Sequence, residues 1–466
     1  MITASLRNLF LKNAAANVMG GAGSALFNLL LPALVIRYIG KLEFSVWTLA
    51  LQILMYLQIF GFGLQTAITK FIAHGSGGGD FSDQKKTIKA GLVLVFGFVS
   101  AAMAMVVILV IFYPLLFKNI PADLVTEFRI CIGLLGMSAA WQLFALVPNG
   151  MFVGLHRNII PVGCTLFVRM LSLLTLWLVL KQGGGLLALS ITLAACGGIL
   201  VPTSYFCAHR WASNLVKHLG ETDWSRVKQL FNYCASLAVW NLAMLFVNGV
   251  DMIIIGHFDF EKVAAYSLAV TSIAVLVGVL QAVLNPLVAI GSSAHASAET
   301  AKKLPNILFL SSISCAAFLI FVYILFLYFG RYILGFWVSP IYVDDVYRFL
   351  LVLLISHAVR NLMMPFSILL VAIAEHRKAF LPAVTEGIVN LCFSLVLVAK
   401  VGAIGVAYAT LIGALAGVIC SFVLVVNKTK VLTISRCSFF YKILLLPLSI
   451  LLVLFFVSFR MIHGNG

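Results

Sequence analysis

Charged residues are scarce in this chain. Only 10% of its 466 residues are Asp, Glu, Lys or Arg, whereas 62% are hydrophobic and the mean hydropathy is +1.11. Soluble domains are about half apolar and about a quarter charged, so this composition excludes a soluble globular protein and a disordered one. It predicts a polytopic membrane protein.

Paired cysteines and clustered histidines are also missing. The nine cysteines stand singly, with no CxxC pair and no spacing that suits zinc, and the histidines are equally dispersed. We therefore expect no metal site and no cofactor, and we interpret the cysteines as small buried hydrophobic residues. The glycine-rich segment from Gly75 to Asp80 is not followed by Gly-Lys-Ser/Thr, which excludes a phosphate-binding P-loop and favours a flexible loop.

What the chain does contain is a series of long apolar runs. A helix of about 20 residues crosses the roughly 30 Å hydrocarbon core of a bilayer, and these runs are continuous, without the alternation of barrel strands. They predict an all-α fold with about twelve transmembrane helices, at 14–36, 44–69, 88–113, 130–153, 158–180, 185–206, 230–257, 263–290, 307–329, 347–373, 379–399 and 402–426. A further run, 443–459, is long enough either to cross as a thirteenth helix or to lie at the interface. The first run exceeds a signal-peptide core, so we expect it to stay attached.

Two parts of the sequence echo each other at an offset of roughly 220 residues, which indicates duplicated halves. His156-Arg157 and His376-Arg377 each join two apolar runs and are each followed by a proline. The runs 181–199 and 400–418 also match, at Gly183/Gly402, Ala188/Ala407, Ala195/Ala414 and Gly198/Gly417. Duplicated apolar halves are typical of transporters. Because the offset spans an even number of helices, the copies face the same side, and we predict a parallel repeat.

The same reading predicts four segments along the chain. These are an N-terminal six-helix bundle at 1–206, a cytoplasmic amphipathic linker at 207–229, a C-terminal six-helix bundle at 230–427, and a basic segment with a possible extra membrane helix at 428–466. The linker mixes basic and aromatic side chains, which suits a helix lying on the inner leaflet. A solvated connector without special chemistry is the alternative.

The distribution of lysine and arginine predicts the orientation. About twice as many of them fall on the side of the N-terminus as on the other side, which favours a cytoplasmic N-terminus. A basic inner face beside anionic lipid then explains much of the net charge of +16, and no nucleic-acid partner is needed. On this topology both His-Arg pairs lie at inner-face turns. We interpret His156, Arg157, His376 and Arg377 as inner-leaflet anchors or inner-gate contacts.

Four charged residues fall within the predicted spans, namely Arg169, Asp251, Arg360 and Glu386. Charge at this depth costs several kcal/mol unless it faces water or a partner, so each is a candidate functional residue. The arginines offer planar forks that match phosphate oxygens. The carboxylates can titrate or bind a coupling cation. Structural pairing of opposite charges between packed helices is the alternative.

Two asparagines extend this pattern. Asn241 and Asn248 are seven residues apart, and Asn248 precedes Asp251 by three, so on one continuous helix the three share roughly one face. Such a polar stripe either lines a cavity or holds helices together.

Several local patterns together resemble a known family. They are Asn13, Asn17 and Gly20–Gly23 in the first predicted helix, Asn248-Gly249-Val250-Asp251 through Gly256, Pro365 through His376-Arg377, and Gly402, Gly405, Ala407 and Thr410. With two six-helix halves, the sequence from about residue 5 to residue 430 resembles the bacterial polysaccharide flippases. These are the O-antigen and capsule repeat-unit transporters of the multidrug, oligosaccharidyl-lipid and polysaccharide exporter superfamily. The possible thirteenth span departs from a plain twelve-helix member.

The resemblance implies a fold like that of the MATE transporters, with two six-helix bundles that open alternately to either side. The implied cargo is an undecaprenyl-pyrophosphate-linked oligosaccharide, moved from the cytoplasmic to the periplasmic leaflet of the bacterial inner membrane. Arg169, Arg360, Asn241 and Asn248 would bind this cargo, and Asp251 or Glu386 would serve H⁺ or Na⁺ coupling or the gate. Membrane lipids and glycan polymerases or ligases are the other implied partners.

Two other functions stay open at this point. The first is an ion-coupled multidrug exporter of the same superfamily, whose site should favour acidic and aromatic residues without arginines in mid-span. The second is a membrane-embedded glycan polymerase or ligase. Such enzymes generally need a sizeable outward loop, and here the only paired carboxylates are Asp344 and Asp345, which are adjacent and so point in different directions on a helix. We therefore predict that the chain is not an enzyme.

Overall fold

The fold was analysed on a computed structural model. It describes residues 4–61, 63–78, 81–117, 120–217, 219–248, 250–293, 298–373, 375, 378, 380–426, 428–429 and 435–463. Throughout these residues the regular elements are helices, as predicted from the apolar runs. The chain forms two compact units, Met1–Leu242 and Ala243–Gly466.

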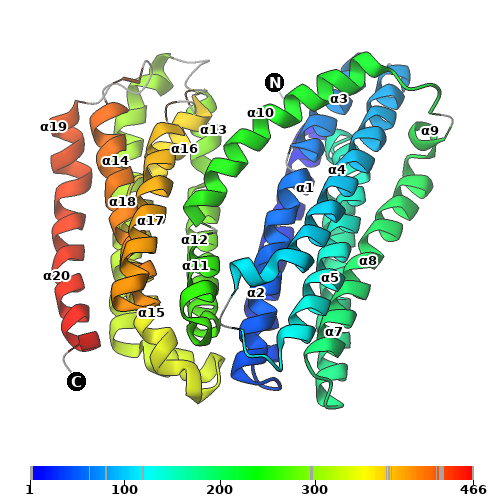
Figure 1. Cartoon of the computed structure of the whole chain (residues 1–466). Helices are drawn as coiled ribbons and strands as arrows, with labels where there is room; N and C mark the ends of the chain where they lie inside the picture. Colours follow the sequence, from blue (N-terminus) through cyan, green and yellow to red (C-terminus); the bar gives the residue numbers. More distant parts are fainter. Residues whose placement is uncertain are drawn as a thin grey trace. The chain divides into compact units, whose positions relative to one another are not determined.

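The first unit contains nine α-helices and most of a tenth (Figure 1). They are α1 (Ala4–Val35), α2 (Lys41–Leu57), α3 (Leu64–Gly78), α4 (Phe81–Leu116), α5 (Val125–Gln142), α6 (Leu146–Gly154), α7 (Ile159–Lys181), α8 (Leu186–Trp211), α9 (Ser213–Val216) and α10 (Trp224–Asn248). Short 3-10 turns join α2 to α3 (η1, Gln58–Gly61) and α5 to α6 (η2, Leu143–Ala145).

The core of this unit lies where α3, α4 and α6 meet. Ile68 and Ile72 of α3 pack there with Val95 of α4 and with Phe152 of α6. Gly154 of α6 permits the close approach of α3, because a Cβ atom at this position would lie only 2.8 Å from Ile72 Cβ.

The second unit contains ten further α-helices (Figure 1). They are α11 (Asp251–Phe258), α12 (Val263–Leu284), α13 (Pro286–Ser293), α14 (Ala298–Trp337), α15 (Val343–Asn361), α16 (Met364–Ala372), α17 (Phe380–Val401), α18 (Ile404–Leu424), α19 (Arg436–Phe439) and α20 (Leu445–His463). A π-helical turn, η6 (Phe440–Leu444), joins α19 to α20. Phe439, Ile443 and Leu451 pack into the core of this unit, so its last helix is part of the fold.

Most of the predicted spans are confirmed. Among the described residues, ten helical stretches are long and apolar enough to cross a membrane, and an eleventh is formed if Pro340–Asn361 and Met364–Ala372, bent by 40°, count as one span. One of the ten is Arg436–Arg460, so the run 443–459 does have the length needed to cross.

Besides 347–373, which divides into α15 and α16, two further predicted spans are broken rather than continuous. The run 44–69 divides into α2, η1 and α3, with Gly63 at a φ of +93° and its Cβ position 3.1 Å from Cys234 Cα, where only glycine fits without strain. The run 230–257 divides into α10 and α11. Hydropathy registers apolar length and does not register such breaks.

Segment boundaries also differ from those predicted. Residues 206 and 207 both lie within α8, and residues 229 and 230 both lie within α10, because the flanking helices continue into the predicted linker. Only the short α9 lies wholly inside it. The boundary between the compact units falls within α10, after Leu242.

The sequence echo has a structural counterpart. Gly183 follows α7 with a φ of +82°, and Gly402 follows α17 with a φ of +74°. Each glycine therefore ends its helix in the left-handed conformation that residues with a Cβ atom rarely adopt. The next helix, α8 or α18, then begins a few residues later. The cysteines of α5, α7, α8, α10 and α14 are buried, as predicted, whereas Cys392, Cys420 and Cys437 are not.

Candidate functional site

Asp251 is the centre of a buried polar cluster in the second unit. Its carboxylate accepts three hydrogen bonds, from Tyr266 Oη on α12 at 3.0 Å, from Asn390 Nδ2 on α17 at 3.0 Å and from Thr410 Oγ1 on α18 at 3.2 Å. All four side chains are buried. Hydrogen bonds to a charged acceptor are about twice as strong as neutral ones. Three helices therefore direct polar groups at a single carboxylate on a fourth helix, α11.

The orientation of these donors follows from their neighbours. Asn390 Oδ1 accepts a hydrogen bond from Ser394 Oγ at 3.3 Å, which turns the amide nitrogen toward Asp251. Thr410 Oγ1 also lies 3.0 Å from the carbonyl oxygen of Val406. A hydroxyl has one hydrogen, so Thr410 donates to one of these two oxygens at a time.

The chemistry of this cluster suits a small hard cation or a proton. Carboxylate, hydroxyl, amide and carbonyl oxygens are the ligands that hard cations prefer. In the described part of the chain no group of three or more His, Cys, Asp or Glu side chains gathers. Around Asp251 such oxygens are those of the carboxylate and of the Tyr266 and Thr410 hydroxyls, whereas Asn390 presents its amide nitrogen.

Arg360 and Glu386 form a second polar pair in the same unit. Arg360 Nε, on α15, donates a hydrogen bond to Glu386 Oε1, on α17. Their side chains are only 18% and 11% exposed. The two predicted site residues therefore form an ion pair, which agrees with the alternative that opposite charges pair between packed helices. They also line a cavity of about 120 Å³, together with Met363, Phe366, Ser367 and Ser421.

A polar stripe on α17 joins the two clusters. Glu386, Asn390 and Ser394 follow one another at intervals of four residues and are all buried, so they lie on one face of the helix. The sequence contains this periodicity, although of the three residues only Glu386 was predicted to belong to the site. A polar residue every fourth position in an apolar helix is the signal that points to this face.

Glycines of α18 make room for this stripe. A Cβ atom on Gly413 would lie 2.9 Å from Asn390 Cβ, and one on Gly417 would lie 3.0 Å from Glu386 Oε2. Gly198, the counterpart of Gly417 in the sequence echo, has nothing within 4 Å of its Cβ position. The matched glycines therefore do not share a role, and only the second unit builds the close contact.

Arg169 lies on α7 of the first unit, and among the described residues no carboxylate pairs with it. Its guanidinium carbon is 5.3 Å from the centre of the Phe27 ring on α1. Its Nη1 atom is buried and has no hydrogen-bond partner among the described residues. This half-buried guanidinium therefore has donor capacity at Nη1 for an anion.

The predicted asparagine face is not continuous. Asn241 and Asn248 belong to α10, whereas Asp251 begins α11, so the three residues do not share one helix. The prediction assumed an unbroken helix through Asn248-Gly249, a dipeptide of low helix propensity. The side chains of both asparagines lie outside the described residues.

The first His-Arg pair lies at the end of α6. His156 has a φ of +59°, and the Arg157 backbone N–H donates to the carbonyl oxygen of Phe152 at 2.8 Å, which closes the helix end. Arg157 Nη1 donates to the carbonyl oxygen of Trp211 at 3.0 Å, at the C-terminal end of α8, where a cation is favoured. Both side chains are exposed. His376 and Arg377 lie outside the described residues.

The asparagines of the first helix contact the residue that follows this pair. Asn13 Oδ1 accepts from the Asn158 backbone N–H at 3.2 Å, and Asn17 Oδ1 accepts from Asn158 Nδ2 at 3.2 Å. Asn13 and Asn17 thus attach α1 to the beginning of α7.

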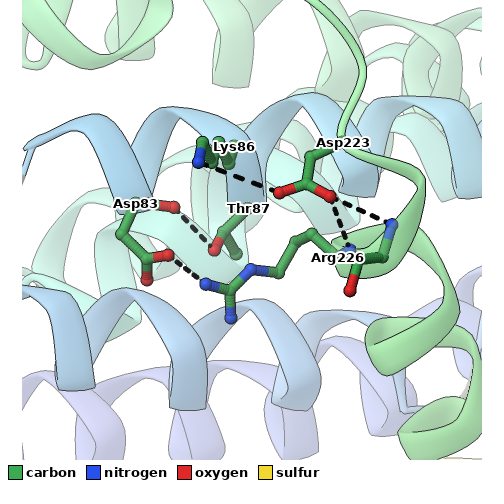
Figure 2. Close-up of polar contacts among 6 residues, drawn as sticks. Asp83, Lys86, Thr87, Asp223 and Arg226 are labelled. Atoms are coloured by element: carbon green, nitrogen blue, oxygen red, sulfur yellow. Dashed lines mark hydrogen bonds and ion pairs between the residues drawn. The ribbon is translucent and has the colours of Figure 1, made fainter.

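The start of α10 is attached to α4 by an ion-pair cluster (Figure 2). Arg226 Nη2 pairs with Asp83 Oδ1, and Lys86 Nζ lies 3.9 Å from Asp223 Oδ2. Asp223 Oδ1 also accepts from the backbone N–H groups of Ser225 and Arg226, at 3.0 and 3.2 Å. This part of the predicted linker therefore packs onto the first unit through specific charges.

The fold of this chain is similar to that of several transporters of known structure. The family model MatE matches residues 21–178. Among curated proteins no match is found. One similar solved structure is that of a lipid II flippase, MurJ, in an inward closed conformation, with a TM-score of 0.70 and 13% sequence identity over 97% of this chain and 99% of that one. Another is that of an inward-facing multidrug resistance MATE family transporter of the MOP superfamily, with a TM-score of 0.69 and 15% sequence identity over 86% of this chain and 93% of that one. A third is a MOP superfamily transporter from Pyrococcus furiosus (0.57, 14%, 91% and 96%). At these identities the likeness shows the fold, which is MATE-like, as predicted.

Proposed function

We propose that this chain is a membrane transporter of the MOP superfamily and not an enzyme. Its proposed cargo is an undecaprenyl-pyrophosphate-linked oligosaccharide repeat unit, which it moves from the cytoplasmic to the periplasmic leaflet of the bacterial inner membrane by alternating access. The likeness to the lipid II flippase supports this proposal, because it extends over 97% of the chain, against 86% for the multidrug transporter.

The observation that carries the choice of cargo is the guanidinium of the half-buried Arg169. Its Nη1 atom is buried without a partner among the described residues. A pyrophosphate carries several anionic oxygens, and guanidinium binds such oxygens through paired hydrogen bonds. The same group would repel a cationic drug. Arg360, Asn241 and Asn248 are the other proposed cargo-binding residues.

The Asp251 cluster supports coupling to an ion. Asp251 is a buried carboxylate whose donors come from three other helices. Binding of H⁺ or Na⁺ there would displace at least one of these donors and so alter how α11, α17 and α18 pack. Glu386, one turn away on α17 and paired with Arg360, is the proposed link between this cluster and the cavity.

An ion-coupled multidrug exporter is the second candidate. The MatE match over residues 21–178 favours it, as does the buried acidic and aromatic pair Asp251 and Tyr266. Growth in the presence of toxic organic cations, in a host that lacks its own exporters, separates the two functions. A flippase gives no protection, whereas a drug exporter does.

Replacing Arg169 by Ala is expected to reduce export of surface glycan at least tenfold, because the proposed phosphate contact contributes about 1.5–3 kcal/mol. Arg169→Lys keeps the charge but loses the fork, and should retain part of the export. The measurement is the amount of surface glycan per molecule of transporter in the membrane.

Arg331→Ala is the matched control, because this arginine is 58% exposed and its ion pair is with Asp344, which is 77% exposed. It should export normally. Full export by both Arg169→Ala and Arg360→Ala, at normal protein level, would rule out the assignment of these arginines to cargo binding.

A further inference from the structure

A second cavity lies at one end of the second unit, between α14 and the turn that leads into α20. It has a volume of about 210 Å³. Its polar lining consists of Asn306 on α14 together with Ser435, Ser438 and Lys442, and Phe309 and Phe439 provide aromatic walls. None of its lining residues belongs to the clusters around Asp251 or Glu386.

The lining presents hydrogen-bond donors and a positive charge, and no carboxylate. Lys442 Nζ lies 5.7 Å from the centre of the Phe309 ring, which places the ammonium at the mouth of the cavity. Ser435 Oγ accepts from the Ser438 backbone N–H at 3.2 Å, so its own hydrogen is available to donate. After Glu386 the sequence contains no Asp or Glu, whereas Arg436 and Lys442 lie on the stretch that forms one side of the cavity.

The cavity has a rigid base. Phe439 and Ile443 are buried in the core of the unit, and the Phe439 ring packs edge-on against that of Phe366 at 5.4 Å between centres. Lys442 lies on the π-helical turn Phe440–Leu444, an element found frequently at functional sites. A buried floor beneath an exposed lysine suits the recognition of a small anionic group.

The surroundings indicate that this anionic group arrives on a lipid. Tyr441 and Leu446, on either side of Lys442, are 68% and 66% exposed. They lie on a stretch, Arg436–Arg460, that is long and apolar enough to cross a membrane. Exposed apolar side chains on such a helix contact acyl chains, and basic pockets at the ends of membrane helices bind lipid headgroups. The cavity thus opens where the headgroups of one leaflet lie.

We propose that this cavity binds the phosphate of an anionic phospholipid, with Lys442 as the charge partner and Asn306, Ser435 and Ser438 as hydrogen-bond donors. The bound lipid would hold the turn before α20 against α14. This site is separate from that of the proposed cargo, and its occupancy does not depend on what the chain transports.

The test uses the purified full-length protein in detergent. Phosphatidylglycerol, phosphatidylcholine or inorganic phosphate is added, and the midpoint of thermal unfolding is measured against concentration. Phosphatidylglycerol is expected to raise the midpoint and phosphatidylcholine to have a weaker effect. Lys442→Gln should weaken the phosphatidylglycerol effect about tenfold in concentration, equivalent to about 1.4 kcal/mol, and Lys442→Arg should preserve it.

Arg460→Gln, at the other end of the same helix, is the control and should behave as wild type. Asn306→Asp, which places a carboxylate in the cavity, should weaken binding as Lys442→Gln does. Equal protection by phosphatidylcholine, or an unchanged response of both Lys442→Gln and Asn306→Asp, would overturn the proposal. Equal protection by inorganic phosphate would also overturn it, because the site would then bind a free anion.

Discussion

Replacing Asp251 by Asn is expected to reduce export of surface glycan to the level of a strain without the transporter. The side chain keeps its size, yet it loses its charge. Its amide N–H₂ group takes the place of one carboxylate oxygen and so faces either Asn390 Nδ2 or the hydroxyls of Tyr266 and Thr410, which are donors as well. Leaving a buried donor without an acceptor costs about 1–3 kcal/mol. We therefore expect the protein to be destabilised by about that amount and to remain foldable. Surface glycan and transporter abundance are measured in the same cells.

Asp344→Asn is the matched control for this substitution, because that carboxylate is 77% exposed and its ion pair with Arg331 is exposed as well. Exposed pairs contribute little to stability, so export should not change. Normal export by Asp251→Asn at normal abundance would contradict the coupling role. A loss of export in proportion to abundance would indicate that Asp251 is needed only for folding.

Breaking the Arg360–Glu386 pair is expected to have the second large effect. Glu386→Gln leaves the Arg360 guanidinium without its buried counterion, and removing one partner of a buried pair costs about 3–5 kcal/mol. Replacing both residues by Met removes the charges together, and such changes are often neutral for stability. Thermal unfolding should therefore show a large loss for the single variant and recovery for the double variant.

The amount of exported surface glycan then distinguishes a structural role of the Arg360–Glu386 pair from a role in transport. If the pair takes part in transport, the double Met variant is stable and does not export. A double variant that exports normally would show that the pair serves only helix packing, and it would exclude the cavity beside it as a cargo site.

Hydropathy alone predicted most of the helices, because each span is a continuous apolar run that has no other way to satisfy its backbone in lipid. It missed the break at Gly63, since a glycine at positive φ leaves the apolar character of the run unchanged. The matching roles of Gly183 and Gly402 could be predicted from the sequence echo. In each copy of the duplicated helix pair the glycine lies between the two helices, and both copies need the same left-handed turn there. The boundary between the two units within α10 could not be predicted, because the amino-acid composition of the helix does not change there.

The site was predicted residue by residue but not as an arrangement. The free-energy cost of placing a charge within a membrane span pointed to Asp251, Arg360 and Glu386 individually. Their partners depend on tertiary packing, since Thr410 is 159 positions from Asp251. Tyr266 in an apolar helix resembles any core aromatic residue. The interval of four between Glu386, Asn390 and Ser394 is the one local pattern that indicated which side of α17 faces its neighbours.

Transport of a lipid-linked oligosaccharide is tested most directly by deleting the gene and measuring this lipid on the two sides of the inner membrane. The proposed flippase predicts that the repeat unit accumulates in the cytoplasmic leaflet and that the surface glycan disappears. A plasmid with the wild-type gene should restore the glycan, and one with Asp251→Asn should not. Unchanged surface glycan without accumulation, in a strain that lacks other transporters of this kind, would contradict the proposed function.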